Sequence, residues 1–294
     1  AQMKPFYINN SLVESVWQQQ QNYKEVVGKN PTGDVYLYFA GNSIYYPNTE
    51  EVFRRTIVEN DHYEFLNFKA NSASTHVFIR DVHKQWYVTG ISQALPDLPS
   101  VVNFLKRRYA GRAVTVVGSS AGGYAAIIAG VLLKARCVFA FSPQLDLNAL
   151  AEAANWDEYQ LVRDFKDASS YAPYSNPANF ADASGSVPIF YFANSNSEDD
   201  QREIEIAKQS RMITTFIFKG DIHGVPVIST LLPHLLAASP EKLMRVANPL
   251  KVWDKHIFGF HICGLKYFAL LAMYKAYRAI KNVGICLRKK WLAN

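Results

Sequence analysis

The run Gly118-Ser119-Ser120-Ala121-Gly122 constrains this chain more than any other part of its sequence. Before it, the β-branched stretch 113–117 predicts a buried strand, and after it the small-residue stretch 122–134 predicts a helix packed closely on a sheet. A strand that turns at once into a helix holds the corner residue in strained geometry, with its side chain exposed at the sheet edge. The context therefore indicates Ser120 as a nucleophile. The alternative is a plain glycine-rich turn, and a phosphate-binding P-loop would need a lysine after the glycines that this sequence lacks.

Apolar strands alternate with amphipathic helices through most of the chain, which predicts an α/β fold with a mostly parallel sheet and helices on both faces. The predicted strands are 35–40, 64–68, 76–80, 113–117, 137–141, 189–193 and 213–218. The predicted helices are 50–59, 98–109, 122–134, 200–210 and 227–237. Residues 143–188 break the alternation over too long a stretch for an ordinary loop, so we expect a cap-like insertion there. The expected organisation is a main domain over 1–244 and a basic helical tail over 245–294.

A serine hydroxyl needs a base that removes its proton and a third group that orients that base. When the serine lies on a strand-to-helix turn, the acid and then the histidine follow it in sequence on loops after later strands. His223 fits this order because it follows the predicted strand 213–218 directly. The other histidines precede the serine, fall inside a predicted helix or lie in the basic tail: His62, His76, His83, His234, His256 and His261. A loop histidine with only structural partners is the alternative for His223.

The acid is expected in the loop after the strand 189–193, where Glu198, Asp199 and Asp200 are adjacent. We favour Asp200, since it is nearest to the helix whose docking would fix it, and Asp199 is the next choice. Some of these carboxylates are alternatively an acidic start to that helix, stabilised by its dipole. Asp146, after the strand 137–141, is a minor rival.

An acyl-transfer site also needs two hydrogen-bond donors for the oxyanion of its tetrahedral intermediate. One is expected to be the backbone N–H of Ala121, directly after the serine. The other is expected from the loop after the strand 35–40, at the backbone of Gly41 or Asn42. An ordinary glycine turn is the alternative explanation of Gly41.

With GSSAGG as the nucleophile turn, NSEDD as the acid loop and DIHG as the histidine loop, residues 30–240 resemble an α/β-hydrolase-fold serine enzyme. The resemblance implies an acyl-enzyme mechanism in which Ser120 attacks an ester carbonyl and His223 moves the proton. Within that superfamily, the GSSAGGYAA turn and the Arg80-Asp81 strand end followed by Trp86-Tyr87 are similar to bacterial capsular and cell-surface polysaccharide O-acetyltransferases. A buried ion pair beside an aromatic core residue is the alternative for Arg80, Asp81 and Trp86.

Charge is concentrated at the C-terminal end of the chain. Residues 251–294 contain nine Lys or Arg and one acid, whereas residues 1–250 carry a net charge of −2. Between 262 and 280, uncharged residues recur at three- and four-residue intervals opposite Lys266, Lys275, Arg278 and Lys281. This pattern favours a helix lying on an anionic membrane surface, and Lys266 interrupts the only stretch that approaches a membrane span. A helix packed on the domain with a solvated basic face, or one that binds an anionic glycan, is the alternative.

These features together predict acyl transfer through a serine acyl-enzyme, with O-acetyl transfer to or from a bacterial surface polysaccharide as the leading expectation. Hydrolysis of a small ester, or a non-catalytic binding protein that retains the fold, is the alternative. No cofactor is expected to be bound permanently, and acetyl-coenzyme A is a candidate acyl donor. No metal site, nucleotide site or nucleic-acid partner is predicted, because the corresponding motifs are missing from the sequence. Three unpaired cysteines and a first segment without the apolar core of a secretory signal predict a cytoplasmic protein, peripheral at the inner face of the membrane.

Overall fold

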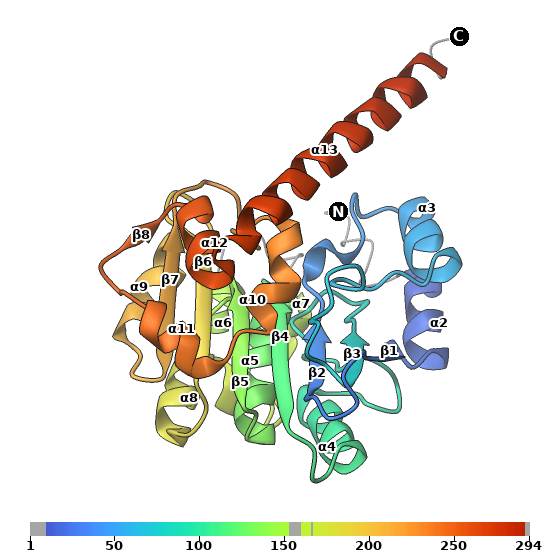
Figure 1. Ribbon diagram of the computed structural model, residues 1–294. Helices are drawn as coiled ribbons and strands as arrows, with labels where there is room; N and C mark the ends of the chain where they lie inside the picture. The colour runs from blue at the N-terminus through green and yellow to red at the C-terminus, as the bar shows by residue number, and fades with distance from the viewer. Residues whose placement is uncertain (1–9, 153–159, 166, 292–294) are drawn as a thin grey trace.

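The computed structural model describes residues 10–152, 160–165 and 167–291, and its centre is a single twisted sheet (Figure 1). Eight strands lie in the order β1-β3-β2-β4-β5-β6-β7-β8. Only β1 runs antiparallel to its neighbour, and all the other pairs are parallel. The carboxyl ends of the parallel strands therefore meet at one edge, which is the edge at the top of Figure 1. Ligands of open parallel sheets bind at such an edge.

The strands are β1 (Tyr23–Val27), β2 (Val35–Phe39), β3 (Thr75–Ile79), β4 (Val114–Ser119), β5 (Cys137–Phe141), β6 (Ile189–Asn194), β7 (Ile213–Phe218) and β8 (Val252–Trp253). The α-helices are α2 (Ser11–Gln19), α3 (Glu50–Phe53), α4 (Leu98–Arg108), α5 (Ala121–Leu133), α6 (Leu147–Glu152), α7 (Gln160–Asp164), α8 (Pro177–Ser184), α9 (Gln201–Gln209), α10 (Leu232–Leu236), α11 (Pro240–Val246), α12 (Lys255–Cys263) and α13 (Lys266–Trp291). Shorter helical turns are η1 (Asn42–Ile44), η2 (Arg54–Glu59), η3 (Ala172–Tyr174) and η4 (Ser229–Leu231).

Two hydrophobic cores lie on opposite faces of the sheet. One contains side chains of α4, α5, α8 and α9, and the other contains side chains of η4, α10, α11 and α12. The central strands β2, β4, β5 and β6 are buried along their whole length, so their continuous apolar runs are what a sheet covered on both faces requires. The predicted α/β class, with a mostly parallel sheet and helices on both faces, is confirmed.

One predicted strand, Glu64–Phe68, is wrong. These residues form consecutive turns, and Phe65 has a left-handed backbone with φ of +64°. The strand β2, the natural partner for an early strand, already pairs with β3 on one side and β4 on the other, so it has no open edge for another strand. The apolar alternation of this segment instead places Phe65 against the rings of Tyr38 and Phe141.

The sequence pattern missed both outer strands of the sheet. The antiparallel strand β1 is only partly buried, and β8 is two residues long, so neither has the apolar run that marks an inner strand. Helix 227–237 is also shorter than predicted, because it is divided between η4 and α10.

The chain after residue 245, predicted as a tail, takes part in the body. Strand β8 pairs with β7, and Phe258 of α12 packs edge-on against Phe216 and Phe218. Gly264, with φ of +58°, separates α12 from α13, so the predicted apolar face spans two helices. The start of α13 contacts η4, where the Thr230 hydroxyl donates to the Leu270 carbonyl, and its later part projects away from the body (Figure 1). In the part of the chain that the structure describes, no helix combines the length and the apolar character needed to cross a membrane.

Candidate active site

Ser120 stands at the sharp turn between β4 and α5. Its backbone has φ of +53° and ψ of −121°, a conformation that L-residues rarely adopt and that marks stored strain. The glycines around it are required by close backbone contacts. A Cβ at Gly118 would meet the Gly122 carbonyl oxygen at 2.0 Å, and a Cβ at Gly122 would meet the Phe39 carbonyl oxygen at 2.0 Å. The motif therefore packs the start of α5 against both β4 and β2.

Three side chains from three loops form a hydrogen-bonded chain at this edge. The Nε2 atom of His223 lies 2.9 Å from Ser120 Oγ, and its Nδ1 atom lies 2.8 Å from Asp200 Oδ1. The histidine comes from the loop after β7, and Asp200 immediately precedes α9. A neutral imidazole with its proton on Nδ1 donates to Asp200 and accepts the serine proton on Nε2, which is the arrangement that activates a serine.

The neighbouring acids predicted as rivals of Asp200 lie elsewhere. Asp200 is fully buried, whereas Glu198 and Asp199 are exposed. Asp146 pairs with Arg202 at the start of α9, with an oxygen–nitrogen distance of 2.5 Å. Asp200 is thus the carboxylate that the structure brings to His223.

A fourth side chain, Ser142, supports the buried acid and was not singled out in the sequence. Its hydroxyl lies 2.9 Å from Asp200 Oδ2, and it accepts a hydrogen bond of 3.0 Å from the backbone N–H of Gly224. One hydroxyl thus joins the acid to the residue that follows His223. The available signal was its position, because Ser142 directly follows β5 at the carboxyl edge of the sheet.

The histidine loop is held by the strand beside it. The side-chain amide of Asn194, at the end of β6, donates to the Ile222 carbonyl at 2.7 Å, and the N–H of Asn196 donates to the Gly220 carbonyl. A Cβ at Gly220 would meet Asn194 Oδ1 at 2.5 Å, so the two loops are in tight contact. These contacts fix the backbone from which His223 extends.

The electrostatics of the site favour the protonated imidazole. Burial lowers the pKa of His223, but the hydrogen bond and charge of Asp200 outweigh that effect and raise the pKa above its ordinary value of 6.5. The charges of Asp199 and Glu203 act in the same direction. A base whose conjugate acid is stabilised in this way accepts a proton from a hydroxyl more readily.

The predicted oxyanion donors lie beside Ser120, but one of them is already engaged. The N–H of Gly41 donates to Glu64 Oε2 at 2.6 Å. Within the described residues, the N–H groups of Ala121 and Asn42 have no hydrogen-bond acceptor. A Cβ at Gly41 would lie 2.7 Å from the Ser119 carbonyl oxygen and 3.4 Å from Ser120 Cβ, so this loop lies directly against the nucleophile turn. Of the two alternatives predicted in the loop, Asn42 is the one with a free donor.

Arg80 and Asp81 do not form the single buried ion pair considered from the sequence. Arg80 pairs with Asp61 at 3.1 Å and lies over the ring of Tyr63. Asp81 instead accepts the backbone N–H groups of His83, Gln85 and Tyr87. This carboxylate holds a loop in which Lys84, Trp86 and Tyr87 all have positive φ.

That loop supports the oxyanion loop and contacts the insertion. The hydroxyl of Tyr87 donates to the Ala40 carbonyl at 2.8 Å, and the Asn42 side chain donates to the Lys84 carbonyl at 3.1 Å. On its other side, the indole N–H of Trp86 donates to Gln144 at 2.9 Å. Residues 143–188 therefore begin in contact with this supporting loop, and a cap over the site stays a prediction.

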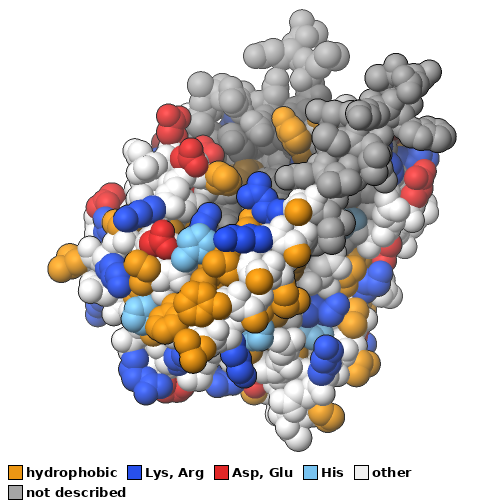
Figure 2. Space-filling model, turned by 45° about the horizontal axis from the view of Figure 1, so that its top comes forward, with side chains coloured by type: hydrophobic (Ala, Val, Ile, Leu, Met, Phe, Trp, Pro, Cys, Tyr) orange, Lys and Arg blue, Asp and Glu red, His pale blue; other side chains and the backbone are white. Residues whose placement is uncertain are grey.

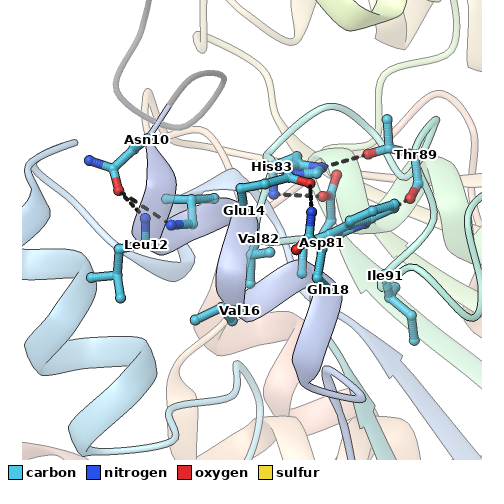
Figure 3. Close-up of polar contacts among 12 residues, drawn as sticks. Asn10, Leu12, Glu14, Val16, Gln18, Asp81, Val82, His83, Thr89 and Ile91 are labelled. Carbon is cyan, nitrogen blue, oxygen red and sulfur yellow. Dashed lines mark hydrogen bonds and ion pairs between the residues drawn. The ribbon is translucent and has the colours of Figure 1, made fainter.

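A second histidine, His83, has both a hydroxyl and a carboxylate as partners (Figure 3). Its Nδ1 atom lies 2.9 Å from Thr89 Oγ1, and its Nε2 atom lies 3.4 Å from Glu14 Oε2. The ring stacks on Trp17 with 5.3 Å between centroids. These contacts join α2 to the loop after β3.

Next to the histidine loop is a hollow of about 430 Å³. Its walls come from the turn segment 62–68, the residues Val225 and Val227 after His223, and Tyr274 of α13. Among the described residues, no group of three His, Cys, Asp or Glu side chains is arranged to hold a metal ion.

No family model and no curated protein matches the sequence. Solved structures do match the fold. Est1E from Butyrivibrio proteoclasticus is 15% identical over 76% of this chain and 93% of its own, with a TM-score of 0.50. The capsule O-acetyltransferase of Neisseria meningitidis serogroup A is 14% identical over 69% and 85%, with a TM-score of 0.47. MGS-MChE2, an alpha/beta hydrolase enzyme from the sediment metagenome of the Mar Chica lagoon in Morocco, is 13% identical over 78% and 94%, with a TM-score of 0.41.

At these identities the likeness concerns the fold. The strand order, the single antiparallel strand next to β3, the strained serine after β4 and the match to Est1E agree with one another. The chain has the α/β-hydrolase fold.

Proposed function

We propose that the protein transfers acyl groups through an ester of Ser120. The observation that carries this proposal is the hydrogen-bonded chain from Ser120 Oγ through His223 to the buried Asp200. His223 Nε2 takes the hydroxyl proton as Oγ attacks the acyl carbonyl. The oxyanion that forms is stabilised by backbone N–H groups, for which Ala121 and Asn42 are the proposed donors. The imidazolium then protonates the leaving oxygen or sulfur, and the acyl group stays on Ser120.

A second nucleophile completes the cycle. His223 removes a proton from the incoming hydroxyl, whose oxygen attacks the acyl carbonyl, and the returning proton regenerates Ser120. If the hydroxyl belongs to a sugar, the reaction is O-acyl transfer, and if it belongs to water, the reaction is ester hydrolysis. Our leading proposal is O-acetyl transfer to or from a surface polysaccharide, supported by the sequence resemblance of the nucleophile turn. Acetyl-coenzyme A is the proposed donor.

Covalent labelling tests the nucleophile. A fluorophosphonate is expected to modify the wild-type protein at Ser120, to leave Ser120→Ala unmodified and to modify Ser119→Ala as it does the wild type. Ser119 is the matched control because it is the adjacent, buried serine of the same turn. A folded wild-type protein that forms no adduct at neutral or mildly alkaline pH would instead favour a non-catalytic binding protein.

The acceptor is tested with acetyl release from an activated ester, with and without polysaccharide and acetyl-coenzyme A. Acetylated polymer that appears only when a donor is present supports the transferase. Ester cleavage that polysaccharide does not change, with no acetylated polymer, supports a simple esterase.

We also propose that α12 and the start of α13 dock on an anionic membrane. The exposed large apolar side chains of these helices and of the link between them are Ile257, Phe260, Leu265, Phe268 and Met273. The exposed cationic side chains are Lys255, Lys266, Lys275 and Arg278. Figure 2 shows hydrophobic side chains gathered on this face with Lys and Arg around them. Apolar residues that enter the headgroup layer beside cations that attract anionic lipids are the two contributions that hold a peripheral protein on a membrane.

Point variants suit this test better than truncation, because β8 and α12 belong to the body. Sedimentation with vesicles of phosphatidylglycerol is expected to fall for Phe268→Ser/Met273→Ser and for Lys266→Gln/Lys275→Gln. The control is Val27→Ser, which removes an exposed apolar residue from the far edge of the sheet. Equal sedimentation of all variants contradicts the docking proposal, and binding to an anionic polysaccharide but not to vesicles would assign these charges to a glycan.

A further inference from the structure

Glu64 reaches the proposed oxyanion loop from a separate segment of the chain. It belongs to the turns between η2 and β3, yet its Oε2 atom lies 2.6 Å from the N–H of Gly41, which follows β2. A carboxylate that accepts a backbone N–H forms a charge-assisted hydrogen bond, which is stronger than a bond between neutral groups. Glu64 also lines the hollow beside the histidine loop, so a side chain of that hollow holds the backbone next to Ser120.

Three contacts fix the short loop after β2. Tyr87 binds the carbonyl of Ala40, the Lys84 carbonyl binds the side chain of Asn42, and Glu64 binds the N–H of Gly41 between them. Of these three contacts, only the one from Glu64 involves a side chain that can carry a charge near neutral pH. Because the N–H of Gly41 is engaged, the adjacent N–H of Asn42 is the donor that this loop can offer to a substrate.

We infer that Glu64 is a positioning residue for the proposed reaction: its carboxylate fixes Gly41, and thereby holds the N–H of Asn42 in place for the oxyanion formed on Ser120. This inference rests on the proposed function. In this arrangement the N–H of Gly41 anchors the loop, and the N–H of Asn42 is the hydrogen-bond donor for the oxyanion. Donors of this kind act because they are already oriented before charge develops, so loosening the loop weakens them without removing them.

The protonation state of Glu64 gives a readout that a purely structural residue would not give. Burial raises the pKa of this carboxyl to about 7, although the Gly41 N–H works against that shift. The other titratable groups around it are His62, Tyr63, Tyr87 and Tyr274. Burial raises the pKa of Tyr63 and Tyr87 further above 10, and it lowers the pKa of His62 below 6.5. The charges of Asp81 and Glu64 also raise the pKa of Tyr87.

Two groups therefore control activity as the pH falls. His223 must be neutral to act as a base, and Glu64 must be ionised to hold Gly41 strongly. Because protonation of either group lowers activity, log(kcat/KM) of the wild type is expected to fall more steeply with decreasing pH than the slope of one proton that His223 alone would give. In Glu64→Gln, which keeps an acceptor oxygen but does not titrate, the slope is expected to be one proton.

The experiment measures kcat and KM on an activated acetyl ester from pH 5 to 9, with fluorophosphonate labelling of Ser120 on the same samples. Glu64→Ala is expected to lower kcat about 10- to 100-fold at pH 8, less than the 10²- to 10³-fold known for complete loss of one donor. KM is expected to change by less than about threefold, because the contact acts on the transition state. Glu64→Gln is expected to recover only part of the loss at pH 8, because a neutral acceptor holds the Gly41 N–H less strongly than a carboxylate does. The matched control is Asp182→Asn, because this carboxylate of α8 also accepts backbone N–H groups, those of Arg211 and Met212 just before β7.

Four outcomes overturn the inference. They are a kcat of Glu64→Ala within twofold of the wild type, a loss confined to KM, an equal loss in Asp182→Asn, and an acid limb as steep in Glu64→Gln as in the wild type. If Glu64→Ala does not fold, the slope of Glu64→Gln decides. If Ser120 is labelled and any of these outcomes is found, the inference alone is rejected. If the wild-type protein shows neither labelling nor turnover, the proposed function and the inference are rejected together.

Discussion

Two histidines in this molecule each have a hydroxyl and a carboxylate as partners, and the two sites differ in every other respect. His223 lies between Ser120 and a carboxylate that is fully buried, at 2.8 Å. His83 lies between Thr89 and Glu14, whose side chain is 47% exposed, at 3.4 Å. Both sites contain a hydroxyl, an imidazole and a carboxylate, so these three groups alone do not identify a catalytic site.

The difference lies in what surrounds each hydroxyl. Ser120 is on a strained turn at the start of a helix, with backbone N–H groups beside it. Thr89 is on a loop after β3 and is 9% exposed, while the histidine that it binds is covered by Trp17 (Figure 3). The first arrangement places its hydroxyl beside the proposed oxyanion donors, whereas the second fastens α2 to the body.

The largest expected difference between the two sites is the change in kcat/KM when the hydroxyl of each site is removed. Ser120→Ala is expected to lower kcat/KM on an activated ester by at least about 10⁴-fold, because the acyl-enzyme can no longer form. Thr89→Val is expected to change kcat/KM by less than about threefold. Steady-state kinetics on both variants checks the comparison, and a large loss in Thr89→Val would mean that the His83 chain takes part in the reaction.

Replacing the buried acid is expected to have the next largest effect. Asp200→Asn keeps the shape of the side chain but favours the wrong tautomer of His223, and it removes the charge that stabilises the imidazolium. We expect kcat to fall about 10³- to 10⁴-fold with labelling of Ser120 strongly slowed. Glu14→Gln, the corresponding change at His83, is expected to leave kcat unchanged. Near-normal turnover in Asp200→Asn would mean that another group orients His223.

The three side chains proposed as nucleophile, base and acid could be located from the sequence because each lies on a loop that follows a strand. Ser120, Asp200 and His223 stand just after β4, β6 and β7, and parallel strands bring their carboxyl ends to one edge. Local patterns therefore gave their order and their neighbourhood. The choice of Asp200 over Asp199 required the start of α9 to be known, because only docking of that helix decides which carboxylate is buried.

Long-range partners could not be read from the pattern. The contacts of Glu64 with Gly41 and of Ser142 with Asp200 join residues 23 and 58 positions apart, and neither pair has a spacing that marks it. Glu64 was also hidden by an apolar alternation that predicted a strand. In that segment tertiary packing of Phe65 outweighed local preference, as it often does for β-type patterns.

Ser142 offers a smaller test of the comparison, because Glu14, the acid beside His83, accepts no hydrogen bond from a hydroxyl among the described residues. Its other side-chain partner is the amide of Gln18. Ser142→Ala leaves Oδ2 of the buried Asp200 without this donor and leaves the Gly224 N–H without its acceptor. We expect a loss in kcat of about tenfold, which corresponds to one hydrogen bond of about 1.4 kcal/mol. Kinetics on Ser142→Ala and on Ser142→Thr, which keeps the hydroxyl, checks this effect, and equal losses in both would point to packing instead.

The exposed acid beside Asp200 is expected to affect only the pH profile. The charge of Asp199 helps to raise the pKa of His223, so Asp199→Asn is expected to move the acid limb of kcat/KM to lower pH. The sign follows because a less stabilised imidazolium loses its proton at lower pH, which keeps the base active there. The plateau above pH 8 is expected to stay the same. A large fall of that plateau would make Asp199, and not Asp200, the functional acid.

The smallest expected effects concern the stability of the His83 chain. Thr89→Val leaves the buried Nδ1 of His83 without a partner and is expected to lower the free energy of unfolding by about 1–2 kcal/mol. Glu14→Gln is expected to lower it by less than about 0.5 kcal/mol, because a 3.4 Å contact with an exposed carboxylate contributes little. Urea denaturation at pH 7 measures both values. Labelling of Ser120 checks that the hydrogen-bonded arrangement of Ser120, His223 and Asp200 is intact. If Glu14→Gln had the larger effect, the carboxylate and not the hydroxyl would be what holds His83, and the two histidine sites would be more alike than their burial indicates.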